Sequence, residues 1–249
     1  MEVMRRLKVE IEGEISTLEF GRVTTETEKE KVFALRYKKY VAKGYIDPEL
    51  FPDGFEKDSF DEEGCEYFVC TLDDEVVGTV RFIQQEFLPT EELFDFPEPS
   101  AIAAMSRNKR AELGRLVIAP PQDGAFYLPR NLVLIFIIDI LVEHCSDKGI
   151  LGGYAFIKES LNKKMKKLSF PFHRIPSHSE HKCKPDNILY PYFTQKSDPV
   201  IPIYFITNEF KNYISKIIEN SWVFYKEEER TYCVRKNLYT RFLKKANII

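Results

Sequence analysis

The chain has 249 residues, enough to bury the core of one large domain or of one domain with a tail. Its 36 Lys and Arg residues face 39 Asp and Glu residues, and the resulting net charge of −3 argues against a nucleic-acid partner. The five cysteines are odd in number and scattered, unlike a secreted disulfide scaffold, so a reducing, cytoplasmic location is expected. The first residues lead into charged residues and not into an apolar run, so no signal peptide is expected. The longest apolar run, 132–142, is far shorter than the ~20 residues that span a bilayer, so no transmembrane segment is expected.

Hydrophobic patterning predicts strands and helices along most of the chain. The capping-box pair Thr25 and Glu28 starts the first helix, and Asp73-Asp74 between two β-rich segments indicates a hairpin. In chain order the predictions are a strand at 7–15, a helix ending at 44, an irregular loop at 47–64, a hairpin at 66–72 and 75–84, an exposed excursion at 86–110, a strand at 112–119, an apolar helix at 130–148, a strand at 150–157, a basic helix at 158–168, strands at 172–175 and 200–207, and a helix from about 208.

Antiparallel strands come early in this order, and a strand–helix–strand unit comes late. This combination predicts an α/β (α+β) fold with one mixed, mostly antiparallel central sheet flanked by helices. The late unit should contribute a parallel pair of strands. We expect one domain over residues 1–225 and a charged helical tail over 226–249.

A set of charged residues recurs along the first half of the chain where local structure does not demand it. Two of them, Glu112 and Arg115, are an odd number of residues apart and would face opposite sides of a flat strand. A bulge near Leu113-Gly114 would bring both to one side. The full set is Arg36, Asp58, Asp61, Arg81, Glu112 and Arg115.

The segments that contain these residues resemble the N-acyl amino acid synthases and the related acyl-homoserine-lactone synthases, a branch of the GNAT superfamily. The resemblance covers roughly residues 30–118 and is carried by an Asp-x-x-Asp, a Gly-Thr-x-Arg and a Glu-x-x-Arg element. It implies a GNAT-like three-layer domain and an acyltransferase that moves a fatty acyl group from a carrier thioester to an amine. In this sequence the elements read Arg36…Tyr40, Phe55-Glu-Lys-Asp58-Ser-Phe-Asp61, Val77-Gly-Thr-Val-Arg81-Phe and Glu112-Leu-Gly-Arg115-Leu.

The resemblance also implies roles for these residues. Glu112 would take the proton of the attacking amine, directly or through a water, and Arg115 would be the second catalytic residue. Arg115 and Arg81 would position Glu112 and the long loop, or grip a carboxylate of the acceptor by bidentate hydrogen bonds. The backbone N–H groups of Val117 and Ile118 would hold the oxyanion. The substrate-binding residues would be Arg36, Asp58, Asp61 and Arg81, which would tether the long loop or contact the acceptor.

The donor is expected to be a phosphopantetheine thioester on an acyl carrier protein, with no permanently bound cofactor. The segment 122–130, where a CoA-dependent relative would bind pyrophosphate, has one glycine and an aspartate that would repel phosphate, so acyl-CoA is disfavoured. Carrier proteins are acidic and need a basic docking face. That face is predicted from Arg130, Lys163, Lys164 and Lys167, although a solvated lysine face would look the same.

Two departures from the lactone synthases favour an amino acid acceptor over S-adenosylmethionine. Those enzymes usually carry a Trp after the first helix and a Ser before the strand's Arg, whereas here the only Trp is Trp222 and the second position is Gly114. A lactone synthase and a catalytically silent GNAT-like binding module remain alternatives. No metal is expected, because the spacing of the histidines at 173–181 and of Cys183 fits no paired-ligand pattern.

Overall fold

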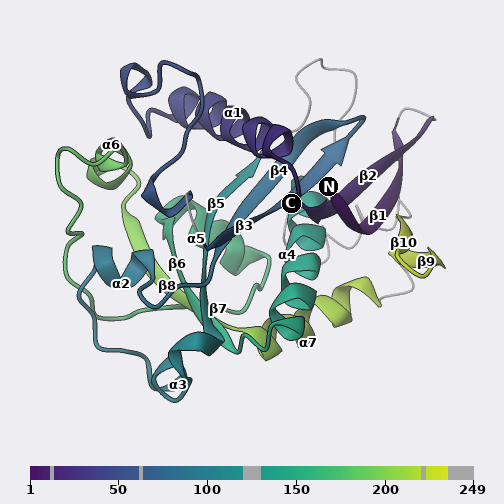
Figure 1. Cartoon of the computed structure of the whole chain (residues 1–249). Helices are drawn as coiled ribbons and strands as arrows, with labels where there is room; N and C mark the ends of the chain where they lie inside the picture. Colours follow the sequence, from purple (N-terminus) through teal and green to yellow (C-terminus); the bar gives the residue numbers. More distant parts are fainter. Residues whose placement is uncertain (12–13, 62–63, 120–129, 220–222, 235–249) are drawn as a thin grey trace.

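The computed structural model describes residues 1–11, 14–61, 64–119, 130–219 and 223–234. These residues form one ten-stranded sheet with helices on both faces (Figure 1). The strands are β1 (Glu2–Ile11), β2 (Glu14–Arg22), β3 (Cys65–Leu72), β4 (Glu75–Ile83), β5 (Arg110–Ile118), β6 (Gly152–Lys158), β7 (Phe172–Arg174), β8 (Val200–Ile206), β9 (Phe224–Glu228) and β10 (Thr231–Val234). Their order across the sheet is β7-β8-β6-β5-β4-β3-β2-β1-β10-β9.

The helices lie between the strands in sequence and cover the sheet. They are α1 (Glu26–Lys43), α2 (Pro89–Leu93), α3 (Ser100–Ala103), α4 (Arg130–Asp147), α5 (Glu159–Lys167), α6 (Tyr190–Thr194) and α7 (Thr207–Ile218), with single 3-10 turns at Pro48–Leu50, Ser59–Asp61 and Arg107–Lys109. None of the helices in the described ranges is long and apolar enough to cross a membrane.

The sheet is mixed and mostly antiparallel, as the order of the predicted elements indicated. Within the described residues, only the β5–β6 and β1–β10 pairings are parallel. Along the chain, α4 lies between the parallel strands β5 and β6, so the predicted strand–helix–strand unit is confirmed.

Two apolar layers hold the helices against the sheet. Alternate residues of β3 and β4, such as Phe68 and Phe82, face the buried helix α4 in the main core. Their neighbours Tyr67 and Val69 point to the opposite face and pack with Val32 of α1. This division follows from the two-residue repeat of a strand. The site described below lies where both layers meet the middle of the sheet.

Local sequence signals placed the ends of several elements correctly. The Thr25 hydroxyl accepts a hydrogen bond from the Glu28 N–H at the start of α1, and the helix ends at Gly44 in the left-handed conformation (φ 64°). Asp73 and Asp74 take φ values of 49° and 63° between β3 and β4, as a tight hairpin turn requires.

The structure corrects several predictions about the termini and the connections. The strand predicted at 7–15 is the hairpin β1–β2, because the alternating pattern runs on through both strands. The tail predicted to be helical contains β9 and β10, and the boundary at 225–226 falls inside β9, while 235–249 lies outside the described residues. The excursion at 86–110 is not simply exposed, since it contains α2 and α3 and buries Leu88 and Ile102. A short helix, α6, occupies part of the loop expected before β8.

Candidate active site

A β-bulge in β5 places Glu112 and Arg115, two of the predicted residues, on the same face of the sheet. Arg81 of β4 pairs with Gly114 and Thr79 pairs with Val117, so one residue of β4 opposes two of β5 at the bulge. The residue with positive φ is Arg115 (55°), not a glycine. The predicted bulge is therefore present, but it lies one residue beyond Leu113-Gly114. A non-glycine residue in this conformation carries backbone strain, which proteins retain mostly at functional sites.

Three arginines and three carboxylates form a closed ring on the α1 face of the sheet. Arg36 contacts Glu56 and donates two hydrogen bonds to Asp61, of 2.9 and 2.8 Å. Arg81 donates to Asp58 at 2.6 and 3.2 Å and lies 2.9 Å from Asp61. Arg115 donates to Glu56 at 3.0 Å and contacts Asp58, which closes the ring. Each charge therefore lies between two charges of opposite sign.

The ring lies where water does not screen it. Arg36 and Glu56 have no exposed surface, and Arg81 is 2% exposed. Burial by itself would raise the pKa of Asp58 and Asp61, but Arg115 and Arg36 respectively are the strongest of the cations that hold both pKa values below the ordinary range. Asp58 and Asp61 are therefore ionised at neutral pH. The ring ties the loop before β3 to α1 and to the sheet.

Glu56 is a member of this ring that the sequence reasoning missed. Its N–H also donates to the Phe33 carbonyl of α1 at 3.2 Å. In the sequence, Glu56 lies between Phe55 and Asp58 in a loop rich in charged residues. Nothing in the sequence distinguishes its carboxylate from those of its charged neighbours, so its place in the ring could not be predicted.

Glu112 lies apart from the ring. It is 1% exposed and accepts a hydrogen bond of 2.7 Å from the N–H of Thr90 in α2. Burial raises its pKa to about 8, and the Thr90 N–H only partly offsets that effect. Glu112 lines neither of the two cavities described below.

A cavity of about 200 Å³ opens where β5 and β6 separate. The two parallel strands pair only from Arg110–Gly152 to Glu112–Tyr154. Beyond that point they diverge, and the cavity is lined by residues 113–116 of β5 and 155–158 of β6. Because the sheet is open there, the cavity connects the α1 face with the face covered by α4 and α5.

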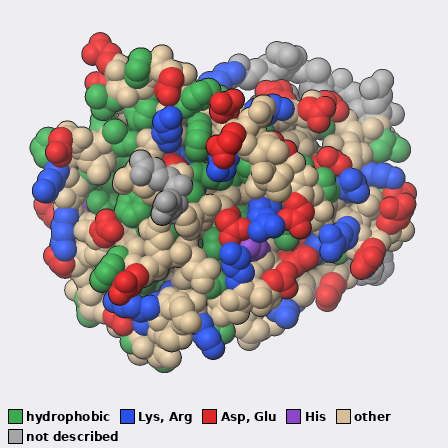
Figure 2. Space-filling model, in the orientation of Figure 1, with side chains coloured by type: hydrophobic (Ala, Val, Ile, Leu, Met, Phe, Trp, Pro, Cys, Tyr) green, Lys and Arg blue, Asp and Glu red, His purple; other side chains and the backbone are tan. Residues whose placement is uncertain are grey.

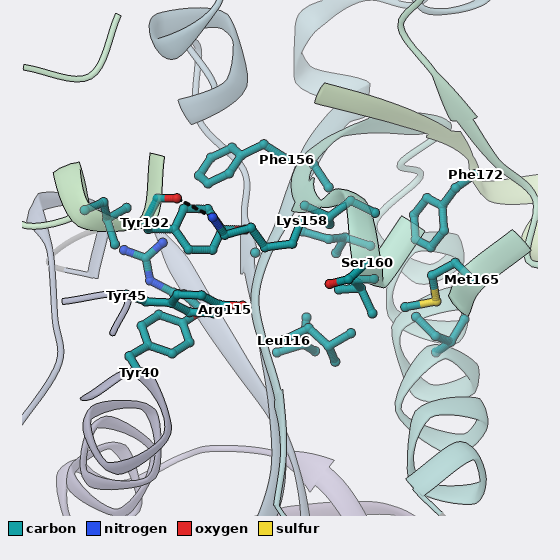
Figure 3. Close-up of a pocket in the computed structure, with 18 residues that line it drawn as sticks. Tyr40, Tyr45, Arg115, Leu116, Phe156, Lys158, Ser160, Met165, Phe172 and Tyr192 are labelled. Atoms are coloured by element: carbon teal, nitrogen blue, oxygen red, sulfur yellow. Dashed lines mark hydrogen bonds between the residues drawn. The ribbon is translucent and has the colours of Figure 1, made fainter. Parts of the chain in front are cut away.

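The two ends of this cavity differ chemically (Figure 3). Met165 of α5 and Phe172 of β7 line an apolar end, together with Ile138 of α4. Arg115 and three tyrosines lie at the other end, beside the ring of charges. The lining tyrosines are Tyr40, Tyr45 and Tyr192.

Lys158, the last residue of β6, crosses between the two ends. The sequence had placed it at the start of an exposed basic helix, but it is only 3% exposed and α5 begins after it. Its ammonium contacts the Tyr192 carbonyl and lies 5.1 Å and 4.4 Å from the ring centroids of Tyr45 and Tyr192 (Figure 3). Burial lowers its pKa to about 8.

A second cavity of about 550 Å³ adjoins the polar end of the first. The two share Phe156 and Leu189 in their linings. Asp58, Asp61 and Arg81 of the ring line the second cavity. Two more carboxylates, those of Glu92 and Asp186, and one more cation, Lys57, complete its charged lining. Carboxylates therefore outnumber cations in this lining, which makes it acidic.

The remaining predicted site residues lie farther from the cavities. Val117 and Ile118 pair with Thr79 and Gly78 of β4 and do not line the first cavity. Lys163 and Lys167 are exposed on α5 and Lys164 is half-buried, while Leu161 and Met165 of the same helix line the cavity. The side chain of Arg130 and the turn at 120–129 lie outside the described residues.

Figure 2 shows basic and acidic side chains interspersed over the visible face of the molecule. Among the residues with described positions, no three His, Cys, Asp or Glu side chains lie close enough together to hold a metal ion. The candidate site therefore consists of the two adjoining cavities and the ring of charges.

Comparisons with known proteins agree with the resemblance seen in the sequence. Residues 31–148 match the family model of the N-acyl amino acid synthase FeeM. No curated protein sequence matches the chain.

Solved structures of two groups of synthases share the fold. The AHL synthase LasI superposes with a TM-score of 0.54 at 15% identity, covering 77% of this chain and 89% of LasI. The CoA-dependent acyl-homoserine lactone synthase MesI gives 0.55 at 18% identity, covering 85% of this chain and 98% of MesI. FeeM from uncultured soil microbes gives 0.52 at 14% identity, covering 79% of this chain and 94% of FeeM.

At these identities the structural likeness shows the fold, and the family-model match adds the sequence pattern of residues 31–148. That segment includes the whole ring of charges and Glu112. The chain is an acyltransferase that resembles the N-acyl amino acid synthases.

Proposed function

We propose that the chain transfers a fatty acyl group from an acyl-carrier-protein thioester to the amine of an amino acid or a similar small molecule. The observation that carries this proposal is the cavity in the β5–β6 splay, which is apolar at one end and polar at the other. An acyl chain needs the first environment, and an amine nucleophile needs the second.

The acyl chain would occupy the end lined by Ile138, Met165 and Phe172. Its thioester carbonyl would then lie in the splay, where β5 and β6 no longer pair with each other. The acceptor would approach from the α1 face through the second cavity, whose carboxylates attract an ammonium group. Both substrates then meet beside Arg115.

The reaction needs a proton acceptor and a site for the oxyanion. The neutral amine attacks the thioester carbonyl, the tetrahedral intermediate collapses, an amide bond forms and the thiol leaves with a proton. Glu112 remains our proposed proton acceptor, and because it lines neither cavity the proton would reach it through a water. Its pKa near 8 suits a base that works near neutral pH. Val117 and Ile118 remain the proposed oxyanion residues.

The ring of charges would hold the loop that carries Asp58 over the acceptor. Arg115 and Arg81 each share Asp58, so the loop, β4 and β5 move as one unit. Catalysis depends on such fixed positioning, since a displacement of about 1 Å can cost ~100-fold in rate.

A carrier protein as donor is supported by the position of the basic residues. One face of α5 lines the cavity through Leu161 and Met165, and its exposed lysines lie on the same short helix. An acidic carrier bound to Lys163 and Lys167 would therefore dock beside the cavity that receives its acyl chain.

The test is to incubate the purified protein with acyl-carrier thioesters, acyl-CoA thioesters and a pool of amino acids. We expect thiol release, followed by absorbance, and N-acyl amino acids in the mass spectrum. An N-acyl lactone formed with S-adenosylmethionine would favour the lactone-synthase alternative instead. Absence of thiol release with every donor and acceptor would contradict the proposal.

A variant whose side chain fills the cavity between β5 and β6 tests whether the reaction takes place there. A Cβ atom built at Gly114 meets no atom within 4 Å, and Gly114 lines the cavity, so we expect the ring of Gly114→Phe to enter the cavity without displacing the strand. We expect it to lose thiol release while keeping its melting temperature. Leu151→Phe adds an aromatic ring at a position that is 46% exposed and serves as the control.

A further inference from the structure

Lys158 is a buried cation for which the described residues supply no counter-ion. None of the carboxylates in the described part of the chain lies within ion-pair distance of its ammonium. The carboxylate with the strongest effect on it, Asp198, instead accepts hydrogen bonds from the Ser160 N–H and hydroxyl at 2.8 and 2.6 Å. A buried charge without a partner is costly, and proteins rarely retain one without a use.

Three contacts stabilise the charged form of the Lys158 amine against the burial that lowers its pKa to about 8. Two aromatic ring faces, those of Tyr45 and Tyr192, attract a cation, and the Tyr192 carbonyl accepts one of its three N–H groups. Two donors therefore remain for a ligand. A neutral amine would gain little from the ring faces.

Arg115, the other cation that lines the cavity, is not available to bind an anionic ligand. Arg115 is already paired with Glu56 and Asp58 in the ring of charges. Of the two cations in the lining, Lys158 is thus the one without an ion-pair partner among the described residues. Its ammonium lies at the polar end of the cavity, with the tyrosines (Figure 3).

The hydroxyls of the tyrosines that line the polar end of the cavity favour an anion as well. Burial raises the pKa of Tyr40 to about 12 and also raises that of Tyr45, so both hydroxyls stay protonated and can donate hydrogen bonds. A cavity lined by an ammonium and by protonated tyrosine hydroxyls offers the donors that a carboxylate or a phosphate needs.

We propose that Lys158 binds the carboxylate of the acceptor and makes the enzyme specific for amines that also carry a carboxylate. This inference rests on the proposed function and adds a specificity-determining residue to it. The acidic second cavity would attract the ammonium of such a zwitterion, and Lys158 would select its carboxylate. The anion could also be the phosphate of the donor arm, and the experiment distinguishes the two sources.

The kinetic test compares an amino acid with its carboxamide, which has the same side chain and amine but no carboxylate. A hydrogen bond to a charged group contributes ~1.5–3 kcal/mol, so Lys158→Met should raise KM for the acid about 10- to 100-fold and leave the carboxamide within about twofold. Lys158→Arg keeps the charge and should restore part of the discrimination. Lys211→Met, at an exposed position on α7, is the control.

Three outcomes would overturn the inference. The ratio of KM values for acid and carboxamide could stay unchanged in Lys158→Met. Alternatively, only the KM for the acyl-phosphopantetheine donor could rise, with that for acyl-pantetheine unaffected, which would assign the anion to the donor phosphate. Finally, kcat could fall equally for both acceptors with no change in KM, which would indicate a proton-transfer role.

A binding measurement on the unmodified protein needs neither turnover nor a folded variant. Binding of the amino acid should raise the pKa of the Lys158 ammonium, measured by NMR of the labelled lysine side chain without any donor. The carboxamide should leave it unchanged. If acyl transfer is absent but the acid still shifts this pKa, the proposed function fails and the carboxylate site stands; if transfer occurs and the pKa does not move, only the carboxylate site fails.

Discussion

The ring of charges balances six buried ions against one another, and its value to the fold depends on its being complete. Removing one arginine leaves two carboxylates that have each lost one of two partners. Arg36→Met removes the cation shared by Glu56 and Asp61, with no exposed surface to let water replace it. We expect a loss of ~3–5 kcal/mol in the free energy of unfolding, measured by urea denaturation.

The exposed pair Arg6–Glu19 provides the matched control. Its arginine is 47% exposed, and Arg6→Met should change the free energy of unfolding by no more than ~1 kcal/mol. Equal losses in the two variants would show that the ring does not act as a buried network.

Glu112 gives the stability a pH dependence of predictable sign. Its pKa of about 8 in the folded protein exceeds the ordinary value of 4.5, so the folded state binds the proton more tightly than the unfolded state does. The proton on Glu112 therefore stabilises the folded state. This stabilisation is complete below pH 4.5 and is lost as the pH rises towards 8. Since each tenfold difference in proton affinity corresponds to ~1.4 kcal/mol, the loss amounts to ~4–5 kcal/mol.

Glu112→Gln tests this directly, because the amide can still accept the hydrogen bond from the Thr90 N–H. We expect the variant to resemble the unmodified protein at pH 5 and to be the more stable of the two at pH 8 and above, in urea titrations at each pH. Glu75→Gln removes one carboxylate from an exposed position and provides the baseline. A difference between Glu112→Gln and the unmodified protein that does not vary with pH would contradict the assignment.

At the scale of the elements, local signals predicted helices and hairpins better than long-range contacts. The cap at Thr25, the stop at Gly44 and the Asp73-Asp74 turn depend on a few neighbouring residues, and all three are confirmed. The strand order could not be predicted, because β1 pairs with β10 from the far end of the chain.

The same limit explains which site residues could be predicted. Arg36, Asp58, Asp61, Arg81 and Arg115 were identified as a set from a family resemblance, and the structure brings them together. The part played by Glu56 depends on two arginines that are distant in sequence, Arg36 and Arg115. Lys158 looked like one lysine of a basic helix, and only the tyrosines packed over it show that it is buried.

Alanine substitutions at Gly153 and Gly114, two glycines of the central strands β6 and β5, should have opposite effects on stability. A Cβ atom at Gly153 would lie 1.7 Å from the carbonyl oxygen of Ala111, inside the paired part of β5 and β6. Gly153→Ala should therefore separate the strands and lower the free energy of unfolding by at least ~2 kcal/mol. Gly114→Ala meets no atom within 4 Å and should leave stability within ~0.5 kcal/mol, by thermal denaturation of both variants. Equal tolerance of the two substitutions would place the close approach elsewhere.

At the scale of the whole molecule, the sheet separates the two proposed substrates. The apolar end of the first cavity lies under α4 and α5, and the acidic second cavity lies on the side of α1 and α2. The β5–β6 splay is where the two sides connect. A carrier protein would then bind beside α5 and the acceptor would enter from the other face, so that neither substrate needs to leave before the other arrives.

This arrangement predicts that charges on α5 matter for one class of donor. Lys163→Glu combined with Lys167→Glu should weaken the attraction of an acidic carrier and lower kcat/KM for acyl-carrier thioesters about tenfold or more at low salt. The effect should shrink as added salt screens the charges. Activity with acyl-pantetheine, which has no carrier, should stay within about twofold. Lys211→Glu with Lys216→Glu makes the same change in net charge at exposed positions on α7 and should leave both donors unaffected. If the two double variants lower the carrier-dependent rate equally, the attraction comes from net charge and α5 is not the docking face.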